Sequence, residues 1–354
     1  MGIPAYRLPR DILKAEIDNI TRLGVKVETN RRLGKDFTLD DLLKSDYKAV
    51  FVSVGAWATR GIGLPGENLE NVYQGIRFLA DVNTGKVTEL KGQVAIIGGG
   101  NVAIDAARSA LRMCADKVRI IYRRRKEEMP ATDEEIAEAE REGVEFIYLV
   151  NPVRIIGDEA EHPDGISKRA KEIICTRMEL KEFDTSGRRS PVPIAGSEFS
   201  IPTDALILAT GQFIEAEELK TSGLKLTRQS AIEVNPDTLE TNVRGVYAGG
   251  DCISGPATVV EAVSAGLKAA SSIDRFLGGK GIIPEKVRKS SRIGEIFFDL
   301  EAEIKEKQRV PIGHLPLTKR GGNFSETEKK YSKEEAIEEA QRCLHCDRKA
   351  EEET

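Results

Sequence analysis

The chain is poor in aromatic residues, which make up 5% of its 354 residues. This low fraction disfavours a surface that stacks carbohydrate rings or single-stranded nucleic acid. No apolar run approaches the roughly 20 residues of a transmembrane helix, so no membrane span is predicted. Positive charge is not in excess either, because 53 Lys and Arg face 58 Asp and Glu, a net charge of −5. Nucleic acid and anionic membranes are therefore not predicted partners.

Cysteine is also scarce, and its pattern excludes a disulfide scaffold. The odd number and the scatter of the first three residues do not fit the paired cysteines of a small secreted domain. No export signal follows Met1, so we expect a cytoplasmic protein. The five cysteines are Cys114, Cys175, Cys252, Cys343 and Cys346.

Buried strands and helices alternate along the chain, whose length suggests about two domains. Continuous apolar runs are typical of strands covered on both faces, and this alternation predicts an α/β fold with a parallel sheet and helices on both sides. The predicted strands are 49–54, 93–97, 118–122, 144–150, 205–209 and 245–248, with a short one at 25–27. The predicted helices are 10–22, 39–43, 101–113, an exposed one at 131–141, 256–277 and 333–342.

Residues 152–203 differ in character from the rest. Short β-like runs there alternate with polar turns, which predicts an antiparallel meander inserted into the parallel fold.

A glycine-rich turn at residues 98–103 follows a predicted strand and opens a helix. It fits the G-x-G-x-x-G/A pattern of dinucleotide-binding turns, with Ala103 in the third place. Gly98 allows the tight turn, and Gly100 lets a pyrophosphate approach the backbone. The helix N-terminus then offers free N–H groups to the phosphates. Residues 61–66 match the same spacing, but Pro65 interrupts them and no capped helix follows, so they are not predicted to bind phosphate.

The end of the next strand indicates which dinucleotide binds. NAD-dependent enzymes place an acidic residue there for the ribose 2′-hydroxyl. Here Arg123 and Arg124 follow Tyr122, and guanidinium groups suit a 2′-phosphate. The pattern favours NADPH over NADH, although a run of arginines also fits a solvated turn.

A second candidate site lies where the strand at 245–248 ends in Gly249, Gly250 and Asp251. A carboxylate there can bind the hydroxyl of a sugar alcohol. The N-terminus of the following helix, near Ala257, Thr258 and Val259, would stabilise charge on a reduced ring. The alternative is a capping aspartate before a core helix.

Six segments, in this order, resemble the small (beta) subunit of glutamate synthase and its relatives. These are NADPH-dependent flavoproteins of the glutathione reductase type with two dinucleotide-binding domains. The resemblance runs from residue 1 to the region of residue 280. The segments are Gly-Ile-Pro-Ala-Tyr-Arg-Leu-Pro (2–9), Val-Gly-Ala (54–56), the turn at 98–105 with Asp105, Tyr-Arg-Arg with Met-Pro-Ala (122–131), Ala-Thr-Gly (209–211) and Gly-Gly-Asp (249–251).

The resemblance implies two Rossmann-like domains, with the NAD(P)H domain inserted into a discontinuous FAD domain. The implied parts are 1–64 (FAD domain, first part), 65–215 (NAD(P)H domain), 216–280 (FAD domain, return segment) and 281–354 (an extension with the terminal cysteines). The reaction implied is hydride transfer from nicotinamide to flavin, in which the protein positions the cofactors. No side chain is therefore assigned as an acid or base. The implied cofactor-binding residues are Gly55, Gly250, Asp251, Ala257, Thr258 and Val259 for FAD, Gly98, Gly100, Asn101, Val102, Arg123 and Arg124 for NADPH, and Gly211 without a cofactor assigned.

The sequence departs from the family at its start. The family carries an FAD fingerprint, a strand with G-x-G-x-x-G, upstream of the segment that here occupies residues 2–9. We therefore expect an FAD domain that is incomplete at its N-terminus. Three explanations stay open: a truncated sequence, a second polypeptide that supplies this half, or loss of FAD.

The terminal pair Cys343 and Cys346 resembles part of the family's iron–sulfur segment. A [4Fe–4S] cluster usually needs four thiolates, and this stretch offers at most three ligands, with His345 as the third. The alternatives are a half-site completed by a partner subunit, a vestigial motif, and a redox dithiol.

The sequence is compatible with three functions. The first is an electron-entry subunit of a hetero-oligomer that passes electrons from NADPH through FAD to an acceptor subunit or a ferredoxin-like iron–sulfur protein. The second is a non-enzymatic nucleotide-binding scaffold that has lost FAD. The third is a simple NADP dehydrogenase, which would need a proton-transfer pair such as Tyr-x-x-x-Lys, and none is placed for it.

Overall fold

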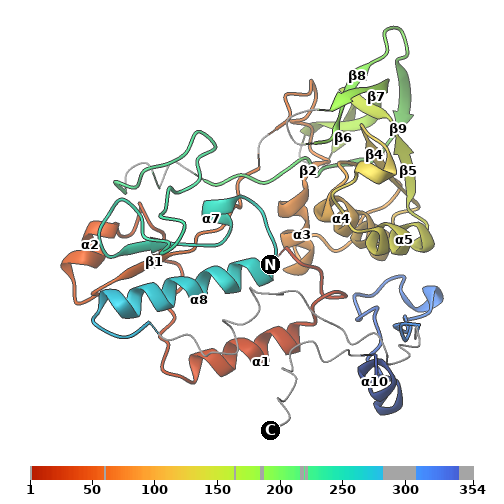
Figure 1. The fold of residues 1–354 in the computed structure, drawn as a ribbon. Coiled ribbons are helices and arrows are strands. Elements are labelled where there is room, and N and C mark those ends of the chain that lie inside the picture. The colour runs from red at the N-terminus through yellow and green to blue at the C-terminus, as the bar shows by residue number, and fades with distance from the viewer. Residues whose placement is uncertain are drawn as a thin grey trace.

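The computed structural model describes residues 2–59, 61–162, 165–183, 187–215, 219, 222–281 and 308–342, with backbone alone for 159–162 and 165–167 (Figure 1). Its helices are α1 (Arg10–Thr21), α2 (Leu39–Lys44), α3 (Gly75–Asn83), α4 (Asn101–Arg112), α5 (Asp133–Glu142), α7 (Asp251–Ser254), α8 (Val259–Phe276) and α10 (Lys333–Ala340), with 3-10 turns η1 (Lys126–Glu128) and η3 (Leu317–Lys319). Its strands are β1 (Val50–Val52), β2 (Val72–Gln74), β3 (Gln93–Ile97), β4 (Lys117–Tyr122), β5 (Glu145–Tyr148), β6 (Val150–His162), β7 (Gly165–Phe183), β8 (Arg189–Pro193), β9 (Phe199–Pro202), β10 (Ala205–Leu208) and β11 (Val246–Ala248).

The larger sheet is parallel, with the order β2-β10-β3-β4-β5. Successive side chains along each of these strands alternate between two hydrophobic cores, one on each face of the sheet. Val94 and Ile96 of β3 pack with helices α3, α4 and α5, whereas Ala95 and Ile97 pack with the meander. The prediction of helices on both sides is therefore wrong for the described part of this sheet. The apolar second face is covered by antiparallel strands instead (Figure 1).

The predicted meander is confirmed. Strands β6, β7, β8 and β9 pair antiparallel, and β7 is the central strand. The side chains of Ile155, Ile173 and Cys175 point toward the parallel sheet and are buried. The meander therefore packs on the second face of the parallel sheet, and the two share one hydrophobic core.

The smaller sheet holds the parallel pair β1 and β11. Its core includes Leu39, Val52 and Ile232, and helices α2 and α8 lie beside it (Figure 1). Helix α1 buries no residue, and apolar side chains of α1 and α8 stay exposed, among them Ile17 and Val260. Ile17 is 49% and Val260 is 77% exposed in the described structure.

Several predicted elements change at their ends or disappear. No strand forms at 25–27. The predicted helix 256–277 begins only at Val259, because Thr258 caps it by accepting the N–H of Glu261, and α7 stands apart before it. Strand β2 was not predicted, because three residues of strand leave no readable period. Helix α3 was not predicted either. The domain boundaries stay a prediction.

A buried charge network joins three distant segments. The carboxylate of Glu142 on α5 binds Arg108 and Arg112 of α4, with closest distances of 3.0 and 2.7 Å. Arg320, from the segment 308–342, reaches the same carboxylate at 2.8 Å and Glu138 at 2.7 Å. Helix α5 is therefore not the exposed helix that its glutamate content predicted, because its inner glutamates neutralise the arginines of α4.

The segment 2–9 docks on the other side of this network. The Tyr6 hydroxyl donates to Asp105 at 3.3 Å, and the Arg7 guanidinium lies 2.6 Å from the same carboxyl. Burial raises the pKa of Asp105 to about 6 against the opposing charge of Arg7. The residues after Met1 thus hold α4, the helix that begins at the glycine-rich turn.

This shifted pKa predicts a pH dependence of stability. Between about pH 4 and pH 6 the native state holds the Asp105 proton while the unfolded chain has lost it, so the free energy of unfolding falls as the pH rises. At 1.36 kcal/mol per pKa unit the change is about 3 kcal/mol. Asp105→Asn should remove this slope in urea unfolding measured across that window. The control is Asp133→Asn, an exposed site on α5. A constant difference between wild type and Asp105→Asn at every pH would contradict the assignment.

Candidate nucleotide-binding sites

The turn between β3 and α4 has the geometry of a phosphate cradle. Gly98 has φ +143°, and a Cβ there would overlap the carbonyl oxygen of Ala209. Gly100, the residue before α4, has φ −95° and nothing within 4 Å of the position of a Cβ. The backbone thus turns tightly at Gly98 and leaves open space at Gly100, as a pyrophosphate beside the helix N-terminus requires.

Gly99, which the sequence pattern leaves unassigned, is fixed by packing. A Cβ there would lie 2.5 Å from the ring of Tyr122. The Tyr122 hydroxyl donates to the carbonyl of Glu128 at 2.7 Å, and the Ala131 N–H donates to the carbonyl of Gly99 at 3.2 Å. The Met-Pro-Ala segment therefore supports the turn from behind, a role that only its position in the fold could reveal.

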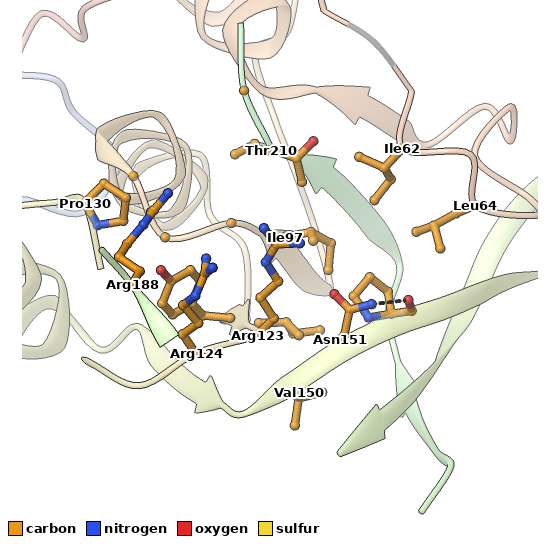
Figure 2. A pocket seen from close by; sticks show the side chains of 18 residues that line it. Ile62, Leu64, Ile97, Arg123, Arg124, Pro130, Val150, Asn151, Arg188 and Thr210 are labelled. Atoms are coloured by element: carbon orange, nitrogen blue, oxygen red, sulfur yellow. Dashed lines mark hydrogen bonds between the residues drawn. The ribbon is translucent and has the colours of Figure 1, made fainter. Parts of the chain in front are cut away.

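A cavity of about 500 Å³ opens in front of this turn (Figure 2). It brings together predicted residues from three strand ends: the glycines of the turn, Arg123 and Arg124 after β4, and Gly211 after β10. The predicted residues Asn101 and Val102 do not line it. The full lining is Ile62, Leu64, Ile97, Gly98, Gly99, Gly100, Ile121, Tyr122, Arg123, Arg124, Pro130, Val150, Asn151, Pro152, Arg188, Ala209, Thr210 and Gly211.

The residues 61–66 that mimic a second dinucleotide turn take another role. No helix follows them, and the next element is β2. Ile62 and Leu64 line the cavity instead. They contribute apolar side chains to its wall.

The two arginines after β4 differ in their surroundings. Arg123 is exposed, whereas Arg124 is 4% exposed and its Nε donates to the Arg189 carbonyl at 2.7 Å. Arg124 thus uses its Nε hydrogen to bind the backbone at the start of strand β8. Arg123 extends into the cavity (Figure 2).

The second candidate site is a smaller cavity of about 220 Å³ beside β1 and β11. A Cβ on Gly249 would lie 2.8 Å from the ring of Phe51, so the strand end needs glycine there. The Asp251 carboxylate accepts the Ala257 N–H at 3.2 Å through Oδ1. Asp251 therefore fixes the entry to α8. All the residues predicted for FAD line this cavity: Gly55, Gly250, Asp251, Ala257, Thr258 and Val259.

Two connecting segments join the cavities. Ala58 and Phe213 form an antiparallel bridge with hydrogen bonds of 2.9 and 2.7 Å. The Gln212 side chain donates to the carbonyl of Ala56 at 3.2 Å. Gly55 lines the second cavity and precedes Ala56, and Gly211 lines the first cavity and precedes Gln212, so both glycines lie next to residues that join the two segments. The link between the sheets runs directly beside both sites.

The described cysteines do not form a metal site. Cys252 is fully buried, and its Sγ donates to the Gly249 carbonyl at 3.3 Å. Burial raises the pKa of Cys175 to about 12, and this thiol lies in the meander core. Among the described residues no group of three or more His, Cys, Asp or Glu could hold a metal. The predicted ligands Cys343 and Cys346 lie outside the described residues.

Residues 9–266 match the pyridine nucleotide-disulphide oxidoreductase family. The chain belongs to this family. The predicted resemblance and the α/β fold with two dinucleotide-binding domains are thereby confirmed.

Several curated relatives are named as subunits or chains of oxidoreductases. The NADP(+)-dependent formate dehydrogenase subunit beta of Moorella thermoacetica is 40% identical over 98% of this chain and 49% of its own length. The NADPH-Fe(3+) oxidoreductase subunit beta of Geobacter sulfurreducens is 34% identical, over 99% and 56%. The glutamate synthase [NADPH] small chain of Azospirillum brasilense is 32% identical, over 81% and 60%. The chain thus spans about half to three fifths of the length of these relatives.

A solved structure shares the fold. FprA of Mycobacterium tuberculosis, determined in complex with NADPH, superposes with a TM-score of 0.60 at 18% identity, over 78% of this chain and 74% of FprA. The likeness supports the arrangement of the two sheets. No helix in the described part of the chain has the length and apolar character needed to cross a bilayer.

Proposed function

We propose that the chain is an NADPH-dependent FAD oxidoreductase subunit that passes electrons to a partner. The observation that carries this proposal is the cavity that joins the glycine-rich turn, including Gly100 at the N-cap of α4, and Arg123 after β4. A helix N-terminus suits a pyrophosphate, and a guanidinium group suits a 2′-phosphate.

The residues present fit NADPH in the first cavity. Gly98, Gly100 and the N-terminus of α4 would hold the pyrophosphate, because the space at Gly100 is open. The N–H groups of Asn101 and Val102 belong to the first turn of α4 and have no partner within the helix. Arg123 and Arg124 would hold the 2′-phosphate, and the apolar wall of Ile62 and Leu64 would exclude water.

The residues of the second cavity fit the flavin end of FAD. Asp251 keeps Oδ2 for a ribityl hydroxyl while Oδ1 fixes the loop at Ala257. The first-turn N–H groups of α8, including that of Val259, lie at the positive end of the helix dipole. This end would stabilise negative charge on a reduced flavin ring. Bound together, the two cofactors supply the hydride transfer, and the protein's part is to orient them and exclude water.

A partner protein is the second part of the proposal. Relatives are named as subunit beta or small chain. An acceptor subunit or a ferredoxin-like iron–sulfur protein fits a flavoprotein that takes electrons from NADPH. A cluster on Cys343 and Cys346, shared with that partner, stays a prediction.

The visible spectrum of the purified protein tests this proposal. We expect a flavin band when the chain is produced alone or with the products of neighbouring genes, and loss of that band when NADPH is added without oxygen. A colourless protein that still binds NADPH would support the alternative, a nucleotide-binding scaffold without FAD.

A further inference from the structure

A third arginine lines the nucleotide cavity, and it comes from outside the parallel sheet. Arg188 directly precedes strand β8 of the inserted meander. It is half-buried and lines the same cavity as Arg123 and Arg124. Figure 2 shows the Arg124 side chain between those of Arg188 and Arg123, with Arg188 beside Pro130. No described residue in the lining carries a carboxylate.

The position of Arg188 is fixed by its neighbour. The Arg189 carbonyl accepts the Nε hydrogen of Arg124 at 2.7 Å, which ties the start of β8 to the end of β4. Arg189 itself pairs with Phe183 across the β7–β8 ladder, and its guanidinium lies 5.8 Å from that ring. Arg188 is therefore held next to the strand end where the 2′-position of a dinucleotide ribose binds.

We propose that Arg188 contacts the 2′-phosphate of NADP(H), which makes the meander part of the specificity site for that cofactor. This inference rests on the proposed function. A phosphate monoester carries a charge of about −1.5 to −2 and three acceptor oxygens. Arg123 approaches it from the sheet and Arg188 from the meander, while the buried Arg124 also supports β8. Bidentate guanidinium contacts from two sides hold such an anion more firmly than one side chain does.

The inference gives the meander a function beyond covering the sheet. Specificity for the phosphorylated dinucleotide then depends on how the β7–β8 hairpin sits against β4. A shift of that hairpin would move Arg188 and leave the pyrophosphate cradle at Gly98 and Gly100 in place. NADP⁺ and NAD⁺ should therefore respond differently to changes at Arg188.

Calorimetric titration of the full chain with NADP⁺, NAD⁺ and 2′,5′-ADP tests the inference. Arg188→Ala is expected to weaken NADP⁺ and 2′,5′-ADP by about tenfold, as for the loss of one hydrogen bond to a charged group, and to change NAD⁺ by less than about twofold. Arg188→Gln keeps most of the side-chain volume and should give the same selective loss. Arg154→Ala is the matched control, because Arg154 is an exposed arginine on β6 of the same meander and does not line the cavity. We expect it to leave all three affinities unchanged. Circular dichroism of each variant checks that it folds.

The outcomes separate this inference from the proposed function. If the wild-type chain binds neither NADP⁺ nor 2′,5′-ADP, the proposed function itself is wrong. If the wild type binds NADP⁺ and Arg123→Ala weakens it, but Arg188→Ala binds like wild type, only the role of Arg188 is overturned. Equal losses for NADP⁺ and NAD⁺ in Arg188→Ala would also overturn it.

Discussion

Replacing Gly100 by alanine is expected to leave the fold intact and to weaken NADP⁺ binding on the order of 100-fold, equivalent to about 2.7 kcal/mol. The backbone of Gly100 is extended and suits any residue, and no protein atom lies within 4 Å of the new methyl group. That methyl would occupy the space assigned to the pyrophosphate. Thermal unfolding should change little, because alanine in place of an N-cap glycine costs less than about 1 kcal/mol. Titration with NADP⁺ measures the loss.

Two other glycines sharpen this experiment. Gly98→Ala should lower both stability and affinity, because the residue has φ +143° and its Cβ would overlap the Ala209 carbonyl oxygen. Gly85, after α3, has φ +72° but open space around it. Gly85→Ala should therefore cost about 1 kcal/mol of stability and no affinity. Unchanged NADP⁺ binding in Gly100→Ala would show that the nucleotide does not use this turn.

Replacing Glu142 by glutamine is expected to lower the free energy of unfolding by about 4 kcal/mol. The Glu142 side chain is 4% exposed and lies against Arg108, Arg112 and Arg320. Burial alone would raise its pKa, but hydrogen bonds from Arg112 and Arg108 outweigh this and hold the pKa at about 2. One neutral amide would then face three buried cations. Urea unfolding at neutral pH measures the change.

A neighbouring glutamate on the same helix provides the control. Glu140 pairs with Lys126 at 2.8 Å, and both side chains are 40% exposed. Glu140→Gln should cost less than about 1 kcal/mol, because exposed ion pairs contribute little. Glu142→Gln should also make the segment around Arg320 more sensitive to protease, since Arg320 loses a carboxylate. Equal stability of the two variants would show that the buried network does not hold these segments together.

The local pattern of the sequence was enough to predict the glycine-rich turn, but not the residues that surround it. The turn at Gly98 was readable because strand, glycines and helix follow one another along the chain. The role of Gly99 was not, because it depends on the ring of Tyr122, which belongs to the next strand. Arg188 was missed for the same reason, since a turn residue of an inserted hairpin carries no signal of the cavity it faces.

Composition was misleading where charge was buried. The glutamates of α5 predicted a solvated helix, but Glu138 and Glu142 neutralise arginines from α4 and from the segment 308–342. The apolar residues of α1 predicted a helix correctly, yet Ile17 and Ile20 stay 49% and 56% exposed in the described structure. Periodicity fixes which face of a helix is apolar, but it does not say what covers that face.

The central claim is that the chain binds NADPH at the glycine-rich turn and delivers its electrons to a flavin beside Asp251. The most direct test is an anaerobic titration of the protein, produced with its partner proteins, while the flavin absorbance is recorded. The account predicts that NADPH bleaches the flavin band at one equivalent per flavin, and that NADH at the same concentration does so far more slowly. A flavin band that NADPH leaves unchanged, in a protein that binds NADP⁺, would contradict it.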